Sequence, residues 1–162
     1  MSENGQLAKQ IVETMKDRKL RLAIVESCTG GQLAAYITAV PGASQVFVGG
    51  LVPYSNAAKA QLLGIDWSTM DKYGVVSEEC ARELVENGEL ALRADFTIAI
   101  TGIAGPDGGT EEKPVGTVYI AWSGPQGMVV EHHLFEGNRA EVQHQSVLRS
   151  LTKLAEMLGP AA

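Results

Sequence analysis

The sequence predicts an α/β fold: a three-layer α/β/α sandwich with a mixed β-sheet at its centre. Three observations lead to this prediction. Stretches with the apolar spacing of a helix alternate with short apolar stretches typical of strands. Residues 95–101, DFTIAIT, form a continuous apolar run, which is typical of a strand buried on both faces. Two later apolar stretches flank Pro125-Gln126-Gly127 and so predict an antiparallel hairpin, which would make the sheet mixed.

Five helices are expected. In the first, Leu7, Ile11 and Met15 recur every four residues. The last begins at Asn138, whose side chain can cap the helix while Glu141 reaches back in a capping box. The helices are expected over residues 4–18, 30–40, 56–63, 78–93 and 138–158. The buried stripe of the last one is expected to comprise Val147, Leu151, Leu154 and Leu158.

The expected strands fill the intervals between these helices. They are residues 20–26, 44–54, 95–101, 116–124 and 127–135. Gly49 and Gly50 in the second strand indicate a bend or a close approach. In the long helix over 78–93, Gly88 weakens the helical pattern slightly.

Composition limits the class of protein. The 162 residues, 45% hydrophobic and 20% charged, have the size and make-up of a single globular domain spanning 1–162. The N-terminus lacks a signal-peptide pattern and no apolar run is long enough to span a bilayer, so we expect a cytoplasmic protein that does not associate with membranes. The net charge of −6 argues against nucleic-acid binding but allows a local pocket for a small anion.

Three polar segments stand where strands end or helices begin, the positions at which α/β proteins gather their sites. The first is ESCTGG (26–31), the second is TGIAGPDGGTEEKPVG (101–116), and the third is FEGNR (135–139). These three segments are therefore the candidate positions for a functional site.

The first segment places Ser27 where a helix begins beside Gly30 and Gly31. Glycines allow backbone N–H groups to approach a ligand, and a helix N-terminus favours an oxyanion or phosphate, so Ser27 is a candidate nucleophile. The alternative is that Ser27 or Thr29 merely caps the helix. The segment is neither a P-loop nor a G-x-S-x-G motif.

A serine nucleophile needs a base. His132 and His133 are adjacent in a strand and face opposite ways, and His144 lies away from the apolar stripe of the last helix. Lys59 is the better candidate, because it follows Ser55 by about one helical turn and could share a cleft with that residue and Tyr54. Burial would make a lysine neutral enough to act as a base. The alternative is a solvated surface lysine.

The other two segments hold further candidate residues. In the second, Thr101 and Gly102 stand at the end of the buried strand, and Gly105 permits a tight backbone path; the alternative is a plain surface loop. In the third, Arg139 lies in the first turn of a capped helix, where its guanidinium favours an anion; the alternative is a solvated arginine.

These motifs, together with YSNAAKAQLLGI (54–65), YGVVSEE (73–79) and TGIAGPDGGTEEKPVGTVY (101–119), resemble the CinA C-terminal domain family in order and spacing. The resemblance covers about residues 6–158. Characterised enzymes of the family are nicotinamide mononucleotide deamidases (PncC), which hydrolyse a carboxamide to a carboxylate and ammonia without a metal or other cofactor. In larger members the domain follows a molybdopterin-binding-like domain, which we do not expect within these 162 residues.

The resemblance implies that Ser27 is the nucleophile and Lys59 its general base, with Tyr54 and Thr101 nearby for orientation or proton transfer. Backbone N–H groups around Thr29, Gly30 and Gly31 would hold the oxyanion. Cys28 is the rival nucleophile. The substrate-binding residues are expected to be Cys28, Thr29, Gly30, Gly31, Ser55, Asn56, Gly102, Gly105 and Arg139, with no metal site. The expected partner is a pyridine nucleotide, and a homo-oligomer is expected.

Two positions depart from the family pattern. Many members continue the last motif as G-D-R-x-x-V-R, whereas Gln143 stands here in place of the second arginine, so a phosphate or charged-loop contact is expected to be missing. Pro53 replaces a common threonine and cannot donate a strand hydrogen bond. These departures motivate the alternative of a catalytically silent relative that acts as a nucleotide-binding or regulatory module. Hydrolysis of another small amide, or a structural role in oligomerisation, is a further alternative.

Overall fold

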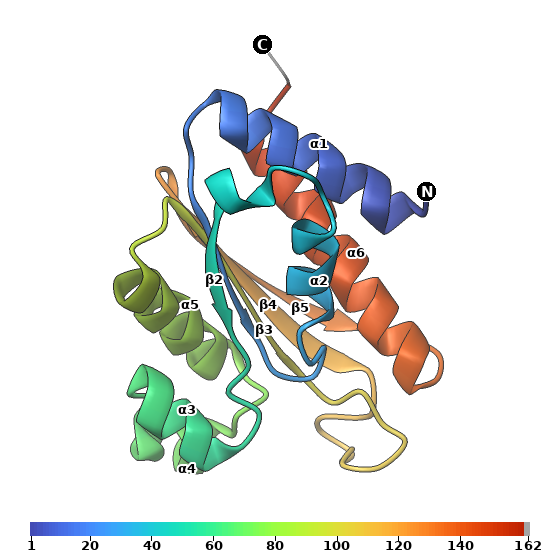
Figure 1. The fold of residues 1–162 in the computed structure, drawn as a ribbon. Helices are drawn as coiled ribbons and strands as arrows, with labels where there is room; N and C mark the ends of the chain where they lie inside the picture. Colours follow the sequence, from blue (N-terminus) through green and yellow to red (C-terminus); the bar gives the residue numbers. More distant parts are fainter. Residues whose placement is uncertain (161–162) are drawn as a thin grey trace.

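The central sheet has five strands and is mixed, as predicted. The computed structural model describes residues 1–160. The strand order is β2-β1-β3-β4-β5; β1 pairs in parallel with β2 and β3, and β3, β4 and β5 pair antiparallel (Figure 1). The strands are β1 (Leu22–Glu26), β2 (Phe47–Leu51), β3 (Phe96–Gly102), β4 (Thr117–Gly124) and β5 (Gly127–Leu134).

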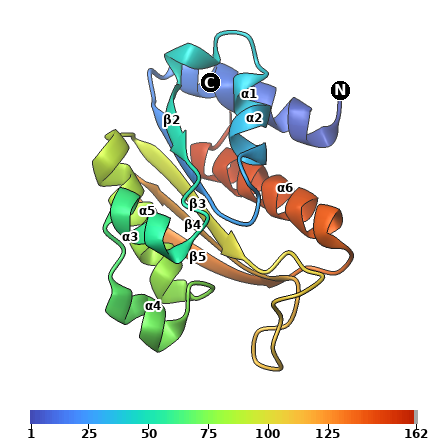
Figure 2. The ribbon, with the colours of Figure 1, turned by 60° about the horizontal axis from the view of Figure 1, so that its bottom comes forward.

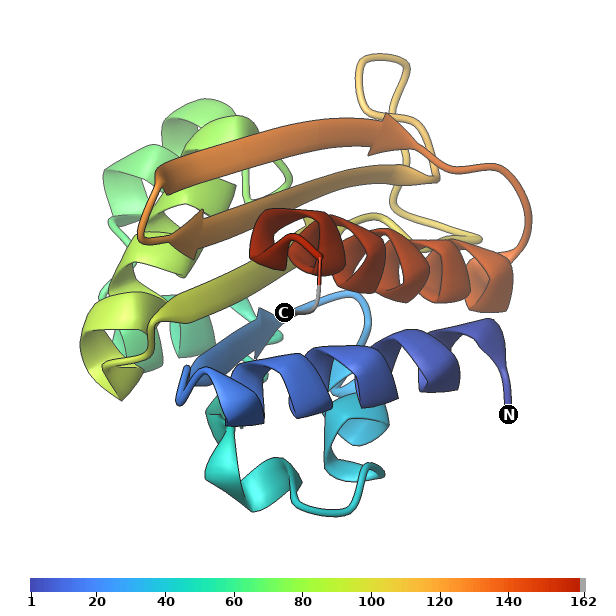
Figure 3. The same cartoon turned by 90° about the horizontal axis from the view of Figure 1, so that it is seen from above.

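Helices cover both faces of the sheet, which confirms the three-layer sandwich. They are α1 (Glu3–Asp17), α2 (Gln32–Thr38), α3 (Asn56–Leu63), α4 (Trp67–Tyr73), α5 (Glu78–Leu92) and α6 (Arg139–Leu158). Helices α1, α2 and α6 lie on one face, with α1 and α6 side by side (Figure 3), and α3, α4 and α5 lie on the other (Figure 1). All five expected helices are present. The sequence analysis missed α4, whose seven residues are too few to establish a clear apolar period.

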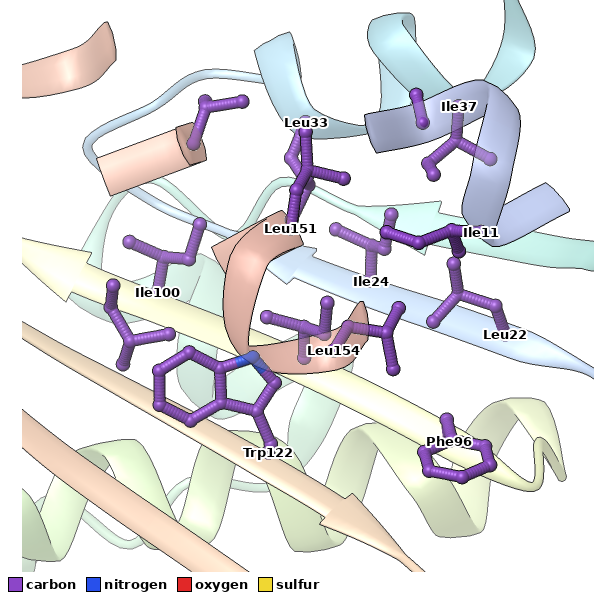
Figure 4. Close-up of a cluster of buried hydrophobic side chains, with 14 of the residues drawn as sticks. Ile11, Leu22, Ile24, Leu33, Ile37, Phe96, Ile100, Trp122, Leu151 and Leu154 are labelled. Atoms are coloured by element: carbon purple, nitrogen blue, oxygen red, sulfur yellow. The ribbon is translucent and has the colours of Figure 1, made fainter. Parts of the chain in front are cut away.

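The larger core lies under α1, α2 and α6 (Figure 4). Successive strand residues point to opposite faces, so Leu22 and Ile24 of β1 enter this core whereas Val25 enters the other. Trp122 is fully buried here, and its indole N–H donates to the Ser150 carbonyl at 3.1 Å. The predicted stripe of α6 is buried as expected, at Val147, Leu151, Leu154 and Leu158.

The opposite core is built from smaller side chains and brings α5 close to the sheet. Ala99 and Ala121 of the sheet belong to this core together with Ala81 and Leu84 of α5. A Cβ atom at Gly88 would lie 2.6 Å from Cγ2 of Val25, closer than packed carbon atoms approach. Gly88 therefore permits the close packing of α5, which explains a glycine that is otherwise unfavourable within a helix.

Several element boundaries differ from the prediction. The second strand is shorter than the expected 44–54, because residues Ala43–Gln45 form a 3₁₀ turn after Gly42, whose φ is +86°. Pro53 lies beyond the end of β2, so it removes no hydrogen bond from that strand. Gly124 pairs with Gly127, which leaves two residues in the hairpin turn.

Within residues 1–160, the helices lack the combination of length and apolar composition that membrane crossing requires.

Candidate active site

Ser27 and Lys59 meet at the end of the sheet where β1 and β3 end. The Lys59 Nζ atom lies 3.2 Å from Ser27 Oγ and 3.2 Å from the Tyr54 carbonyl oxygen. Ser27 directly follows β1, and Lys59 belongs to the second turn of α3. Figure 2 shows that the turn after β1 and the loop of residues 103–116 lie at this same end of the molecule. The candidate nucleophile and the candidate base are therefore within hydrogen-bond distance of each other.

The Lys59 amine is buried, with 1% of the residue exposed, whereas Ser27 keeps 8% exposure. Removal from water disfavours the ammonium form and lowers the pKa of Lys59 below its ordinary value of 10.5. Electrostatic interactions with Cys80 and Cys28 act in the opposite direction and raise the pKa of Lys59, but by less than burial lowers it. The alternative of a solvated surface lysine is therefore wrong, and burial enlarges the fraction of Lys59 that is neutral.

A buried carboxylate, Glu26, organises the turn that carries Ser27. Its Oε1 accepts hydrogen bonds from the Thr29 hydroxyl at 2.7 Å and the Leu33 N–H at 2.9 Å, and its Oε2 accepts from the Ala34 N–H at 3.1 Å. The first free N–H groups of α2 are thereby satisfied, and the negative charge suits the helix N-terminus.

The alternative that Ser27 or Thr29 caps the helix is wrong. The N-cap of α2 is Gly31, with φ of +102° and no side chain to bond, and Glu26 supplies the cap from the preceding strand. The sequence analysis missed Glu26. Its only signal was an acidic residue at the end of an apolar strand, directly before a glycine-rich helix start.

Backbone N–H groups of the turn divide into used and unused donors. The Gly30 N–H donates to the Ser27 carbonyl at 3.1 Å, so it is not open to an oxyanion. Among residues 1–160, the N–H groups of Thr29 and Gly31 donate to no protein acceptor. The expected set of oxyanion donors thus narrows to these two positions.

Cys28 lies next to Ser27 but in a different environment. Its thiol is buried beneath Gly102, where a Cβ atom would lie 3.1 Å from the Cys28 sulfur. Burial raises the pKa of the Cys28 thiol to about 12. A thiol with this pKa carries almost no thiolate at neutral pH, and the thiolate is the reactive form.

A pocket of about 420 Å³ adjoins this pair. Its lining includes Tyr54, Gly102, Gly105, Asp107, Lys113 and Arg139. The Arg139 guanidinium donates to the Gly105 carbonyl at 2.7 Å and to the Tyr54 hydroxyl at 2.9 Å, which ties the second and third polar segments together. Four of the predicted residues therefore line one pocket. Ser27 and Lys59 are not among its lining residues, but Lys59 donates a hydrogen bond to the carbonyl of Tyr54, which is one of them.

Three other predicted residues lie outside this arrangement or have other partners. The Thr101 hydroxyl donates to the Val75 carbonyl at 2.8 Å, so its side chain braces the pocket wall. The Ser55 hydroxyl accepts from the Ala58 N–H at 3.0 Å and caps α3. Asn56 is exposed at the start of α3. Ser55 and Asn56 are both exposed and do not line the pocket.

The histidines belong to other regions. His132 and His133 belong to the edge strand β5, where His132 stacks on Tyr119 and His133 stacks on Phe135. The Nδ1 atom of His144 lies 3.5 Å from Nδ2 of Asn4 on α1. Within residues 1–160, no three His, Cys, Asp or Glu side chains are grouped so that they could hold a metal ion.

The family model described as the CinA C-terminal domain matches residues 4–158, nearly the whole chain. The chain belongs to the CinA C-terminal domain family. Similar curated proteins include a CinA-like protein of Thermotoga maritima, 45% identical over 148 residues, and a putative competence-damage inducible protein of Thermoanaerobacter sp. strain X514, 45% identical over 149 residues. The alignments cover 91% and 92% of this chain but only 36% of each relative, so the chain spans about a third of their length.

Solved structures of the family share the fold. The competence damage-inducible protein A of Klebsiella pneumoniae superposes with a TM-score of 0.93 at 32% identity, covering 97% of this chain and 98% of that one. The competence/damage inducible protein of Agrobacterium tumefaciens superposes with a TM-score of 0.91 at 35% identity, covering 99% and 98%. Both likenesses extend over the whole sheet and its two helical layers.

Proposed function

We propose that this protein hydrolyses the carboxamide of a pyridine nucleotide, nicotinamide mononucleotide, to the carboxylate and ammonia. The observation that carries the proposal is the 3.2 Å contact between Ser27 Oγ and the buried Lys59 amine. A hydroxyl becomes a nucleophile when an adjacent base takes its proton, and a neutral amine supplies that base.

In the first half of the reaction, Ser27 Oγ forms a bond to the amide carbon as its proton passes to the neutral Lys59 amine. The carbonyl electron pair moves to oxygen, and the Thr29 and Gly31 N–H groups are the donors available to stabilise the resulting oxyanion. When the tetrahedral intermediate collapses, the carbon–nitrogen bond breaks. Lys59 returns its proton to the departing nitrogen, which leaves as ammonia.

The second half releases the acyl group. A water molecule gives a proton to the neutral Lys59 amine and attacks the acyl carbon, and the ester bond to Ser27 breaks. The proton returns to Ser27 Oγ, which restores the starting state. The Tyr54 carbonyl, 3.2 Å from Lys59 Nζ, keeps the amine directed at Ser27 through both halves.

Charge in the adjoining pocket supports an anionic substrate. Arg139 and Lys113 line the pocket with one carboxylate, Asp107. The contacts of Arg139 with Gly105 and Tyr54 hold its guanidinium in place and leave further N–H donors for a phosphate. This local excess of positive charge contrasts with the net charge of −6 of the whole chain.

The deciding experiment follows ammonia and the carboxylate product during incubation with nicotinamide mononucleotide. We expect turnover by the unaltered protein and a loss of about 10³-fold or more in kcat for Ser27→Ala. Without the nucleophile, the base and the oxyanion donors have no covalent step to assist. Cys28→Ala is the matched control and is expected to retain most activity, since its buried thiol is protonated.

Other results would assign a different function. Saturable binding of the nucleotide by calorimetry without any product would instead favour the nucleotide-binding or regulatory module. Retained turnover in Ser27→Ala with loss in Cys28→Ala would reverse the choice of nucleophile.

A further inference from the structure

Gln143 reaches from α6 to the turn that carries Ser27. Its side-chain Nε2 donates a hydrogen bond to the Cys28 carbonyl oxygen at 2.9 Å, across 115 positions of sequence. Gln143 is half-buried and lies one helical turn beyond Arg139, on the helix whose first residues border the pocket. Gln143 stands where many family members have a second arginine, and in this chain its side chain binds the protein's own backbone.

This bond fixes more than one carbonyl. The peptide between Cys28 and Thr29 is planar and trans, so its C=O and N–H point in opposite directions. Holding the Cys28 carbonyl toward α6 also fixes the direction of the Thr29 N–H. That N–H donates to no protein acceptor among residues 1–160.

The turn is thus held from two sides. On one side, Glu26 accepts from the Thr29 hydroxyl and from the first N–H groups of α2. On the other, Gln143 holds Cys28. Ser27 lies between these attachments, and its own N–H donates to the Ile100 carbonyl of β3 at 3.1 Å.

We propose that Gln143 is a positioning residue for the proposed amide hydrolysis: by holding the Cys28 carbonyl it aligns the Ser27 hydroxyl with Lys59 and directs the Thr29 N–H at the oxyanion. The inference rests on the proposed function. It assigns Gln143 no contact with substrate, so its loss acts on the chemical step and leaves binding intact.

The test compares two substitutions at this position. Gln143→Glu keeps the size of the side chain but removes the donor and places a carboxylate against a carbonyl. We expect kcat for nicotinamide mononucleotide to fall about tenfold with KM changed less than about twofold, because one aligning hydrogen bond is lost. Gln143→Arg restores a donor and is expected to return kcat to within about threefold of the unaltered protein.

A second measurement reports on the turn without any catalysis. Hydrogen exchange of the segment containing residues 27–31, followed by mass spectrometry, is expected to accelerate about tenfold in Gln143→Glu. Gln145→Leu is the matched control, because the Gln145 amide also donates to backbone carbonyls, those of Glu136 and Glu141, but at the start of α6. We expect no change of exchange in residues 27–31 for this control.

The outcomes are separable from those of the proposed function. Unchanged exchange in Gln143→Glu, or unchanged kcat despite faster exchange, would overturn the inference, as would a rise in KM at constant kcat, which marks a substrate contact. If the unaltered protein forms no ammonia, the proposed function fails. Selective acceleration of exchange in Gln143→Glu would then still support the anchoring of the turn, and its absence would reject it.

Discussion

Lys59 and Glu131 are both shielded from water, but their surroundings favour opposite states, a neutral amine and a charged carboxylate. Lys59, at the end of the sheet, has a hydroxyl and a backbone carbonyl as its hydrogen-bond partners, and burial lowers its pKa. Glu131, on the edge strand β5, accepts two hydrogen bonds from Arg149 of α6, each 2.8 Å long, and lies 2.8 Å from His133. The hydrogen bonds from Arg149 lower the pKa of Glu131 to about 2.

The difference separates a chemical group from a structural one. A buried amine whose hydrogen-bond partners carry no negative charge favours its neutral form. The neutral amine can accept a proton, but it forms no ion pair that would stabilise the fold. A cation beside a carboxylate keeps the carboxylate charged and unreactive while it ties a strand to a helix. Four measurements can test this comparison.

The largest effect is expected from Lys59→Met, which keeps an unbranched side chain one atom shorter but removes the base. The loss in kcat/KM for nicotinamide mononucleotide should be about 10²–10⁴-fold, the usual contribution of a general base. Glu131→Gln, on the structural ion pair, is the matched control and should stay within about twofold. A comparable loss in both variants would show that the rate reports stability alone.

The pH dependence of kcat/KM should follow the Lys59 amine. Because burial lowers its pKa, the neutral base is populated at lower pH than for a free lysine, and the rate should fall as pH drops through that lowered pKa. The acid limb approaches tenfold per pH unit for a single group. A rate that rises only above pH 10.5, the ordinary value, would contradict a buried neutral base.

The smallest effects are on the free energy of unfolding, and they should have opposite signs. Lys59→Met should raise it at pH 7, because burial makes the ammonium less favourable in the folded protein than in the unfolded chain. Glu131→Gln should lower it by about 1 kcal/mol through loss of the Arg149 pair. Chemical denaturation of both variants measures the two differences.

The sign for Glu131 can be checked by titration. Its folded pKa of about 2 lies below the ordinary 4.5, so its contribution is present above pH 4.5 and disappears as pH falls through about 2. The difference between the unaltered protein and Glu131→Gln should shrink over that interval. A constant difference would show that Glu131 stabilises the fold without its charge.

Much of this architecture was visible in the order of residues. The apolar period of α1, the capping box at Asn138 and the double-faced apolar run of β3 are local signals, and each predicted its element correctly. The α4 helix was not predicted, because seven residues are too few to show a helical apolar period. The role of Glu26 was not predicted, because its hydrogen-bond partners lie up to eight positions further along the chain. Gly88, which weakened a local pattern, is explained only by Val25 on the neighbouring strand.

The sequence by itself determined the alternation of strands and helices, the mixed sheet and the short list of polar segments, because periodicity and turn chemistry act between near neighbours. Only the tertiary structure decided which polar groups share an environment. Lys59 is a buried amine against Ser27, Cys28 is a protonated thiol, and Gln143 holds the turn, because burial and contact depend on segments brought together by packing.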